Sequence, residues 1–166
     1  MIDVLLVDDH KIMRDGLKAI LRSHTGYRIA GEAASGHEAV LMAKTLRPHV
    51  VVMDLNLPGL SGLEATSEIM RHLPGTRIVV LSMYDDDATV MEAMRAGARG
   101  FVLKSGSDED LVQALEARAG ELATQGQEGE PDLLRAEARA LGGAPAAGQA
   151  KPDAVAPHSG PGRAAR

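Results

Sequence analysis

The stretch VVVMDLNLPG, residues 50–59, is the point from which the fold can be worked out. Four apolar residues open it, three of them β-branched, and a Pro-Gly pair closes it as a turn signal. A short apolar run between breakers indicates a strand buried on both faces, which is typical of parallel sheets. Asp54 ends this strand, where open α/β sheets bind their ligands. Taken alone, Asp54 is equally consistent with a carboxylate that caps a loop.

Five apolar runs of this kind alternate with five segments of helical periodicity. The runs lie at residues 4–7, 27–32, 50–54, 78–81 and 100–103, and the helical segments begin near residues 13, 35, 61, 90 and 107. Strict alternation predicts a flavodoxin-like (βα)5 sandwich of three layers, with a parallel sheet in the order 2-1-3-4-5. The second run is the least apolar, which suits an edge strand. Ser35 with Glu38, and Ser61 with Glu64, predict capping boxes at two helix starts.

Composition narrows the class of protein. The chain has 166 residues, a net charge of −5, 2% aromatic residues and no cysteine. The absence of cysteine excludes disulfides and zinc–thiolate sites, and the negative charge argues against a nucleic-acid surface. No segment has the length of a membrane span or the pattern of a signal peptide. We expect a cytoplasmic α/β protein that does not associate with membranes.

The composition changes near Ala117. More than half of the residues from there to Arg166 are Ala, Gly or Pro, with one short helical pattern at residues 131–141. Such a segment lacks the apolar residues that a packed core needs. We therefore predict a folded domain over residues 1–118 and a mostly disordered tail over residues 119–166.

Polar residues follow four of the five predicted strands. Asp8 and Asp9 follow the first, Asp54 ends the third, Ser82 follows the fourth and Lys104 follows the fifth. The carboxyl ends of parallel strands share one edge of the sheet, so these side chains are expected to converge. Crowded carboxylates favour a hard divalent cation such as Mg²⁺, while a lysine and a hydroxyl can bind phosphoryl oxygens. The set indicates an aspartate that accepts phosphate with the help of a metal.

Each of these residues also has an ordinary structural explanation. Asp8 and Asp9 would cap the next helix, Ser82 would be a loop hydroxyl and Lys104 would be solvated. Their placement at matched strand ends favours the functional interpretation. The six histidines show no ligand spacing and are expected at the surface; they are His10, His24, His37, His49, His72 and His158.

Four motifs resemble the receiver domain of response regulators in two-component systems. They are LLVDDH at 5–10, MDLNLPGLSG at 53–62, LS at 81–82 and GFVLK at 100–104. The resemblance covers about residues 2–117. The DDH start and the GLEA run at 62–65 are similar to the LuxR/NarL-type subfamily, which carries a helix-turn-helix output domain.

The resemblance implies a set of roles. Asp54 would take a phosphoryl group from the phosphohistidine of a sensor histidine kinase. Mg²⁺ would be held by Asp9, Asp54 and the carbonyl of Asn56, with Asp8 acting through water. Lys104 would contact the phosphoryl group. Ser82 and Phe101 would switch together, Phe101 rotating inward where the family often has Tyr. The expected partners are the kinase and a second copy of the chain.

Two other classes of function compete with a phosphate-accepting receiver. A LuxR-type DNA-binding regulator needs a basic recognition helix, whereas acids outnumber bases from residue 120 onward, so DNA binding is not expected of this chain. Two explanations of the tail stay open: an out-of-frame reading of a GC-rich gene, or a native flexible segment. An aspartyl-phosphate phosphatase usually carries a second Asp two residues after its nucleophile; Asn56 stands there and lacks the general acid.

Overall fold

The computed structural model describes the backbone of residues 1–123 and the side chains of residues 1–118. Five strands and five helices alternate along this part of the chain, as predicted. They are β1 (Ile2–Val7), α1 (Lys11–Arg22), β2 (Tyr27–Ala33), α2 (Gly36–Leu46), β3 (Val50–Asp54), α3 (Gly62–His72), β4 (Arg77–Ser82), α4 (Asp87–Ala96), β5 (Gly100–Leu103) and α5 (Asp108–Ala123).

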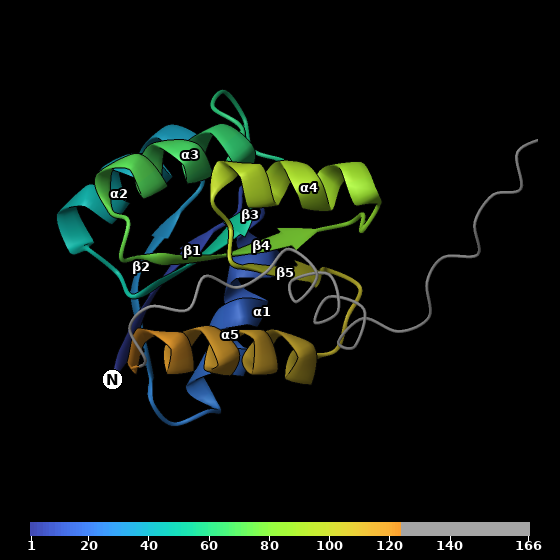
Figure 1. Cartoon of the computed structure of the whole chain (residues 1–166). Coiled ribbons are helices and arrows are strands. Elements are labelled where there is room, and N and C mark those ends of the chain that lie inside the picture. Colours follow the sequence, from blue (N-terminus) through green and yellow to red (C-terminus); the bar gives the residue numbers. More distant parts are fainter. Residues whose placement is uncertain (124–166) are drawn as a thin grey trace, which may run out of the picture.

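The strands form one parallel sheet in the order β2-β1-β3-β4-β5. Helices α2, α3 and α4 cover one face of the sheet, and α1 and α5 cover the other (Figure 1). This confirms the predicted flavodoxin-like sandwich and its strand order. The weakly apolar second strand, β2, lies at an edge of the sheet, where only one neighbour pairs with it.

A separate hydrophobic core lies on each face of the sheet, and β3 contributes to both. Val51 and Met53 pack in the core under α2, α3 and α4, while Val50 and Val52 pack in the core over α1 and α5. All five residues of β3 are buried, as the apolar run at 50–54 predicts. Burial of an aliphatic side chain contributes roughly 1.5–3 kcal/mol, so β3 is fixed firmly and holds Asp54 in place.

The two predicted capping boxes form to different extents. At α3 the box is complete: Ser61 accepts the N–H of Glu64, and Glu64 accepts the N–H of Ser61. At α2, Ser35 accepts the N–H of Glu38, but the Glu38 carboxylate accepts the N–H of Ala34 instead. The prediction of a full box at Ser35 is therefore only half right.

The backbone of α5 continues to Ala123, past the predicted domain end at residue 118. The rest of the predicted tail, with the helical pattern at 131–141, lies outside the described residues. None of the helices in the described part of the chain has the length and hydropathy that crossing a bilayer requires.

Candidate functional site

The carboxyl ends of β1, β3, β4 and β5 meet at one edge of the sheet, as expected for parallel strands. A cleft of about 460 Å³ opens there. Its lining includes Asp54 from β3, Asn56 from the following loop, Ser82 from β4 and Lys104 from just after β5. Three predicted strand-end groups therefore share one cleft, and Asp8 joins them through Lys104.

Lys104 ties two strand-end carboxylates together inside the protein. Its Nζ lies 3.0 Å from Asp8 Oδ2 and 3.1 Å from Asp54 Oδ1, and all three side chains are buried. Burial alone would lower the pKa of Lys104, but its bonds to Asp8 and Asp54 outweigh this effect and raise the pKa. The alternative of a solvated Lys104 is excluded, because the ammonium group is part of a buried ion cluster.

Asp54 uses only one of its two carboxylate oxygens. Oδ1 accepts the backbone N–H of Asn56 at 3.1 Å and pairs with Lys104. Oδ2 is buried and has no hydrogen-bond partner among the described residues. Burial, and then the negative charge of Asp8, raise the pKa of Asp54 against the opposing influence of Asn56 and Lys104. A buried carboxylate oxygen without a partner is costly in a fold, which marks it as a candidate reactive atom.

The structure argues against Asp8 and Asp9 as caps of α1. The cap residue of α1 is His10, and within the described chain no side chain caps the helix there. Asp8 Oδ1 accepts the N–H of His10, which precedes the helix, at 2.8 Å. The pair therefore fits the functional interpretation better than the structural one.

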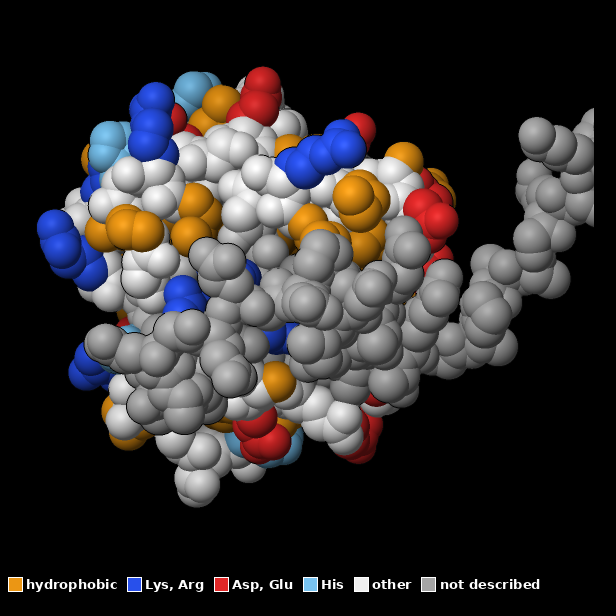
Figure 2. Space-filling model, in the orientation of Figure 1, with side chains coloured by type: hydrophobic (Ala, Val, Ile, Leu, Met, Phe, Trp, Pro, Cys, Tyr) orange, Lys and Arg blue, Asp and Glu red, His pale blue; other side chains and the backbone are white. Residues whose placement is uncertain are grey.

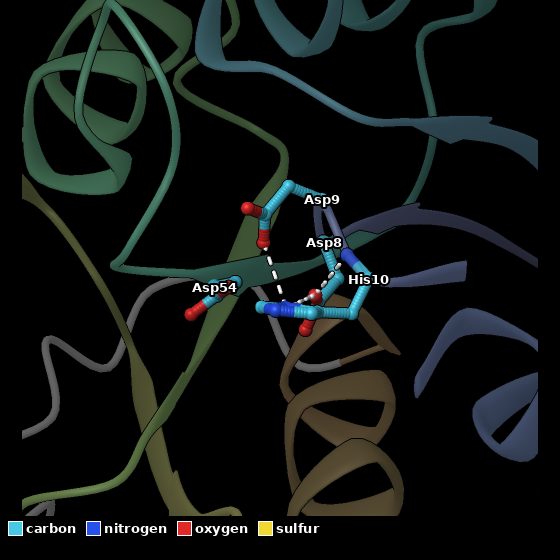
Figure 3. Close-up of side chains that lie close together, drawn as sticks. All are labelled: Asp8, Asp9, His10 and Asp54. Atoms are coloured by element: carbon cyan, nitrogen blue, oxygen red, sulfur yellow. Dashed lines mark hydrogen bonds and ion pairs between the residues drawn. The ribbon is translucent and has the colours of Figure 1, made fainter. Parts of the chain in front are cut away.

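Four side chains at this edge could supply metal ligands: Asp8, Asp9, His10 and Asp54. Each offers one ligand atom, and these atoms all lie within 4.8 Å of one another (Figure 3). Three carboxylates against the single charge of Lys104 leave a net charge of −2, which a divalent cation balances. Oxygen ligands suit Mg²⁺, so the residues fit the metal predicted from the sequence.

His10 was missed as a neighbour of this cluster. It is largely exposed, as predicted, but its Nδ1 lies 2.9 Å from Asp9 Oδ1 and 3.2 Å from Asp8 Oδ1. His10 belongs to no pair of histidines with metal-ligand spacing, so the histidine pattern of the sequence does not reveal it. The signal was its position directly after two acidic residues.

The two predicted switch residues are both buried in this conformation. Ser82 is 5% exposed, and its Oγ accepts the N–H of Tyr84 at 3.1 Å. Phe101 is 3% exposed and packs in the core under α2, α3 and α4. The expected gain in burial from an inward rotation of Phe101 does not apply to this conformation, because the ring is already inside.

Comparison with known proteins identifies the family of the described domain. The response regulator receiver domain matches residues 4–116. An uncharacterized transcriptional regulatory protein of Bacillus subtilis, YxjL, is 40% identical over 118 residues, which are 71% of this chain and 54% of YxjL. The chain thus matches only about half the length of this curated relative.

Solved structures of response regulators are also similar to this chain. A LuxR-family two-component response regulator from Aurantimonas sp. SI85-9A1 has a TM-score of 0.70 at 38% identity, covering 82% of this chain and 96% of that one. The isolated REC domain of RcsB from Salmonella enterica serovar Typhimurium, solved with phosphomimetic BeF3⁻, has a TM-score of 0.68 at 27% identity, covering 83% and 99%. The sequence match, the sheet order and the clustered strand-end residues agree, and the chain belongs to the response regulator receiver domain family.

Proposed function

We propose that Asp54 accepts a phosphoryl group from the phosphohistidine of a sensor histidine kinase. The observation that carries the proposal is Asp54 Oδ2, a buried carboxylate oxygen with no described hydrogen-bond partner at the edge of a cleft. This oxygen attacks phosphorus, an O–P bond forms, the P–N bond of the donor breaks, and the electron pair leaves with the imidazole. The phosphomimetic used with the REC domain of RcsB supports phosphoryl chemistry in this family.

Asp8, Asp9, Asp54 and the backbone carbonyl of Asn56 are the proposed ligands of Mg²⁺. When bound, the metal supplies positive charge that stabilises the oxygens of the phosphoryl group in transfer. The net charge of −2 around Lys104 supports this assignment, because it leaves the cluster short of one divalent cation.

Lys104 and Ser82 are proposed to bind the transferred phosphoryl group. The Lys104 ammonium is already held beside Asp54 Oδ1, where a new phosphoryl oxygen is within reach of a small shift. Ser82 borders the same cleft, and its hydroxyl can donate to an anionic oxygen. Moving there requires Ser82 Oγ to give up the N–H of Tyr84, and this loosens the loop that leads into α4.

We propose that the loss of this hydrogen bond between the Tyr84 N–H and Ser82 Oγ passes the phosphorylation of Asp54 on to the rest of the domain. The surface formed by α4, β5 and α5 would then favour different partners in the two states. Phe101 of β5 pairs in register with Val80 of β4, so its packing couples the two strands that lead to Ser82 and Lys104.

Phe101→Leu is expected to leave labelling of Asp54 intact and to reduce the NMR shift changes over residues 90–115. A full pattern of shift changes in this variant would make Phe101 an ordinary core residue.

The named function of YxjL supports a role in transcription, which we propose for the protein to which this receiver belongs. A gel-shift assay with the 166-residue chain is expected to show no DNA binding of its own, because its last segment lacks a basic stripe. A salt-sensitive shift would contradict this expectation.

Intact mass spectrometry tests the proposed acceptor. The chain is treated with acetyl phosphate, with Mg²⁺ or with a chelator. We expect one added phosphoryl group in the wild type with Mg²⁺ and none in Asp54→Asn. Asp85→Asn, at an exposed carboxylate of the loop before α4, is the matched control and is expected to label normally. Labelling of Asp54→Asn to the extent of the wild type would overturn the assignment.

A further inference from the structure

The pairing between β1 and the edge strand β2 shifts by one residue along its length. Val4 of β1 pairs with Ile29, but the next residue of β1 pairs with Gly31, so β2 carries one extra residue between them. Ile29 packs against the core over α1 and α5, whereas Ala33 lies in the core under α2, α3 and α4. Residues four apart share a face in a regular strand. The extra residue therefore turns the end of β2 over, as β-bulges next to functional sites do.

Glu32 reaches α1 because of this change of face. Three residues after Ile29, it would point to the α2 side in a regular strand, but its carboxylate bonds to two basic side chains of α1. Oε1 accepts Nε of Arg14 at 3.2 Å, and Oε2 accepts Nζ of Lys18 at 3.0 Å. The hydrogen bond from Lys18, assisted by Arg14, lowers the pKa of Glu32, so the carboxylate is charged at neutral pH. The end of β2 thus holds both cations in place.

Arg14 connects Glu32 to the turn that carries the acidic cluster. Its Nη1 donates to the backbone carbonyl of Asp8 at 2.6 Å, and its side chain is only 16% exposed. The planar guanidinium fixes this donor relative to the Nε that Glu32 accepts, which an ammonium group cannot do. The N–H of Asp8 donates to the carbonyl of Ala33 at 3.1 Å. Both backbone groups of Asp8 are therefore anchored to the end of β2, one directly and one through Arg14.

We propose that Arg14, held by Glu32, is a positioning residue for the two carboxylates of Asp8 and Asp9. The carbonyl that Arg14 holds belongs to the planar peptide that joins these two residues, so a rotation of this peptide would carry the Asp9 carboxylate away. Arg14 itself is not among the described residues that line the cleft. Its role is to orient the ligands of Mg²⁺, and in this respect the inference rests on the proposed function.

A positioning role and a simple charge effect predict opposite changes in Mg²⁺ affinity. Removal of a cation near crowded carboxylates strengthens Mg²⁺ binding by electrostatics. Loss of a partner that orients metal ligands weakens binding by about 10–100-fold. Arg14→Met keeps the apolar stem and removes the guanidinium. We therefore expect this variant to bind Mg²⁺ about ten-fold more weakly than the wild type.

Lys18→Met is the matched control. Lys18 pairs with the same carboxylate and is buried to a similar extent, 19% exposed against 16% for Arg14. It bonds to Asp15 and Glu32 rather than to Asp8. We expect its Mg²⁺ affinity to be unchanged or slightly tighter. Arg14→Lys keeps the charge but not the fork of donors, so its affinity should lie between those of the wild type and Arg14→Met.

Amide NMR of the full chain measures these effects without any phosphodonor. In the absence of Mg²⁺, Arg14→Met and Arg14→Lys should already shift the amide signal of Asp9, and Lys18→Met should not. Titration with Mg²⁺ then gives the affinities. With acetyl phosphate, Arg14→Met should need about ten-fold more Mg²⁺ for half-maximal labelling, while its rate at saturating Mg²⁺ stays near that of the wild type.

Mg²⁺ binding by Arg14→Met that equals or exceeds that of the wild type would overturn the proposal. An unchanged Asp9 signal in the metal-free variant would do so as well. If Arg14→Met does not fold, Arg14→Lys carries the same comparison. A chain in which Arg14→Met loses Mg²⁺ affinity, but in which the wild type never labels at Asp54, would contradict the proposed function and leave the positioning role standing.

Discussion

The surroundings of Asp54 disfavour the ionised form of its carboxyl group. Burial and the neighbouring Asp8 raise its pKa, and the attraction of Lys104 does not cancel them. A carboxylate in such a setting destabilises the ionised folded state, but it keeps one oxygen ready to react. The same residue therefore connects the stability of the domain to its proposed chemistry.

The stability of the domain should depend on pH through Asp54. A raised folded pKa means that the folded state binds more protons than the unfolded state, from the unfolded pKa near 3.8 up to the folded value. Stability is lost as pH rises through this window. Asp54→Asn removes the free-energy cost of keeping an ionised carboxylate buried, so we expect it to raise the melting temperature by a few degrees at pH 7. The difference should vanish below about pH 3.8. A variant that melts below the wild type at pH 7 would contradict this.

Lys104→Met should lower the stability of the folded domain, because it leaves Asp8 and Asp54 buried without their cation. Breaking a buried pair costs about 3–5 kcal/mol, and urea denaturation at pH 7 measures it. Lys44→Met is the control, since Lys44 lies 3.7 Å from Glu68 at the surface, where a pair contributes about 0–1 kcal/mol. Equal losses in the two variants would show that Lys104 is not a buried counter-ion.

Five of the site residues could be predicted from the sequence, because their position follows from the ends of strands. Each stands where an apolar run stops, and parallel strands bring such ends together; the five are Asp8, Asp9, Asp54, Ser82 and Lys104. The approach of His10 could not be predicted in this way. It depends on the side-chain conformation of a residue between β1 and α1, which no periodicity encodes.

The start of α3 is packed directly against the end of β3. A Cβ at Gly62 would lie 2.1 Å from the carbonyl oxygen of Asp54 and 2.7 Å from Cα of Leu55. Both are backbone atoms and cannot swing aside, so the absence of a side chain at Gly62 sets the distance between helix and strand. The helix thereby braces the strand end that carries the candidate acceptor.

Gly62→Ala is therefore expected to destabilise the domain by about 1–3 kcal/mol or more, as overpacking does, and to shift the NMR signals of Asp54 and Leu55. Gly16→Ala is the matched control inside α1, where a Cβ meets nothing within 4 Å. Alanine is the better helix former there, so this change should stabilise by about 0.5–1 kcal/mol. Chemical denaturation compares the two variants. Similar behaviour of both would show that Gly62 is not a packing constraint.

The elements themselves could be predicted because each carries its own period and its own breakers. The side-chain hydrogen bonds that cap the helix N-termini were harder to predict. Ser35 and Ser61 stand in the same Ser-x-x-Glu pattern, yet φ is −147° at Ser35 and −65° at Ser61. This rotation turns the N–H of Ser35 away from Glu38, whose carboxylate then accepts from Ala34. The difference comes from how β2 leads into α2, which lies beyond a four-residue pattern.

At the scale of the molecule, the sheet order could be predicted because strict alternation leaves few ways to connect parallel strands. The burial of Phe101 could not be predicted with the same assurance. An apolar residue on β5 can face either helical layer, and in the structure Phe101 joins the core under α2, α3 and α4. On the face of the molecule that Figure 2 shows, basic, acidic and hydrophobic side chains are interspersed at the surface.

Truncation tests whether the described domain is self-sufficient. The described residues 1–118 supply both hydrophobic cores and the acidic cluster. A chain that ends at Ala123 is therefore expected to keep the melting temperature and the Mg²⁺ affinity of the full chain. Calorimetry and metal titration compare the two chains. A large loss on truncation would show that residues after 123 stabilise the domain.

The central claim is that Asp54, rather than Asp8 or Asp9, carries the phosphoryl group. Sodium borohydride reduces an aspartyl phosphate to homoserine, so reduction of the labelled wild type followed by peptide mass spectrometry identifies the modified position. We expect homoserine in place of Asp54 only, in the peptide that contains β3, and none when Mg²⁺ is withheld. Homoserine in place of Asp8 or Asp9, with Asp54 unmodified, would contradict it.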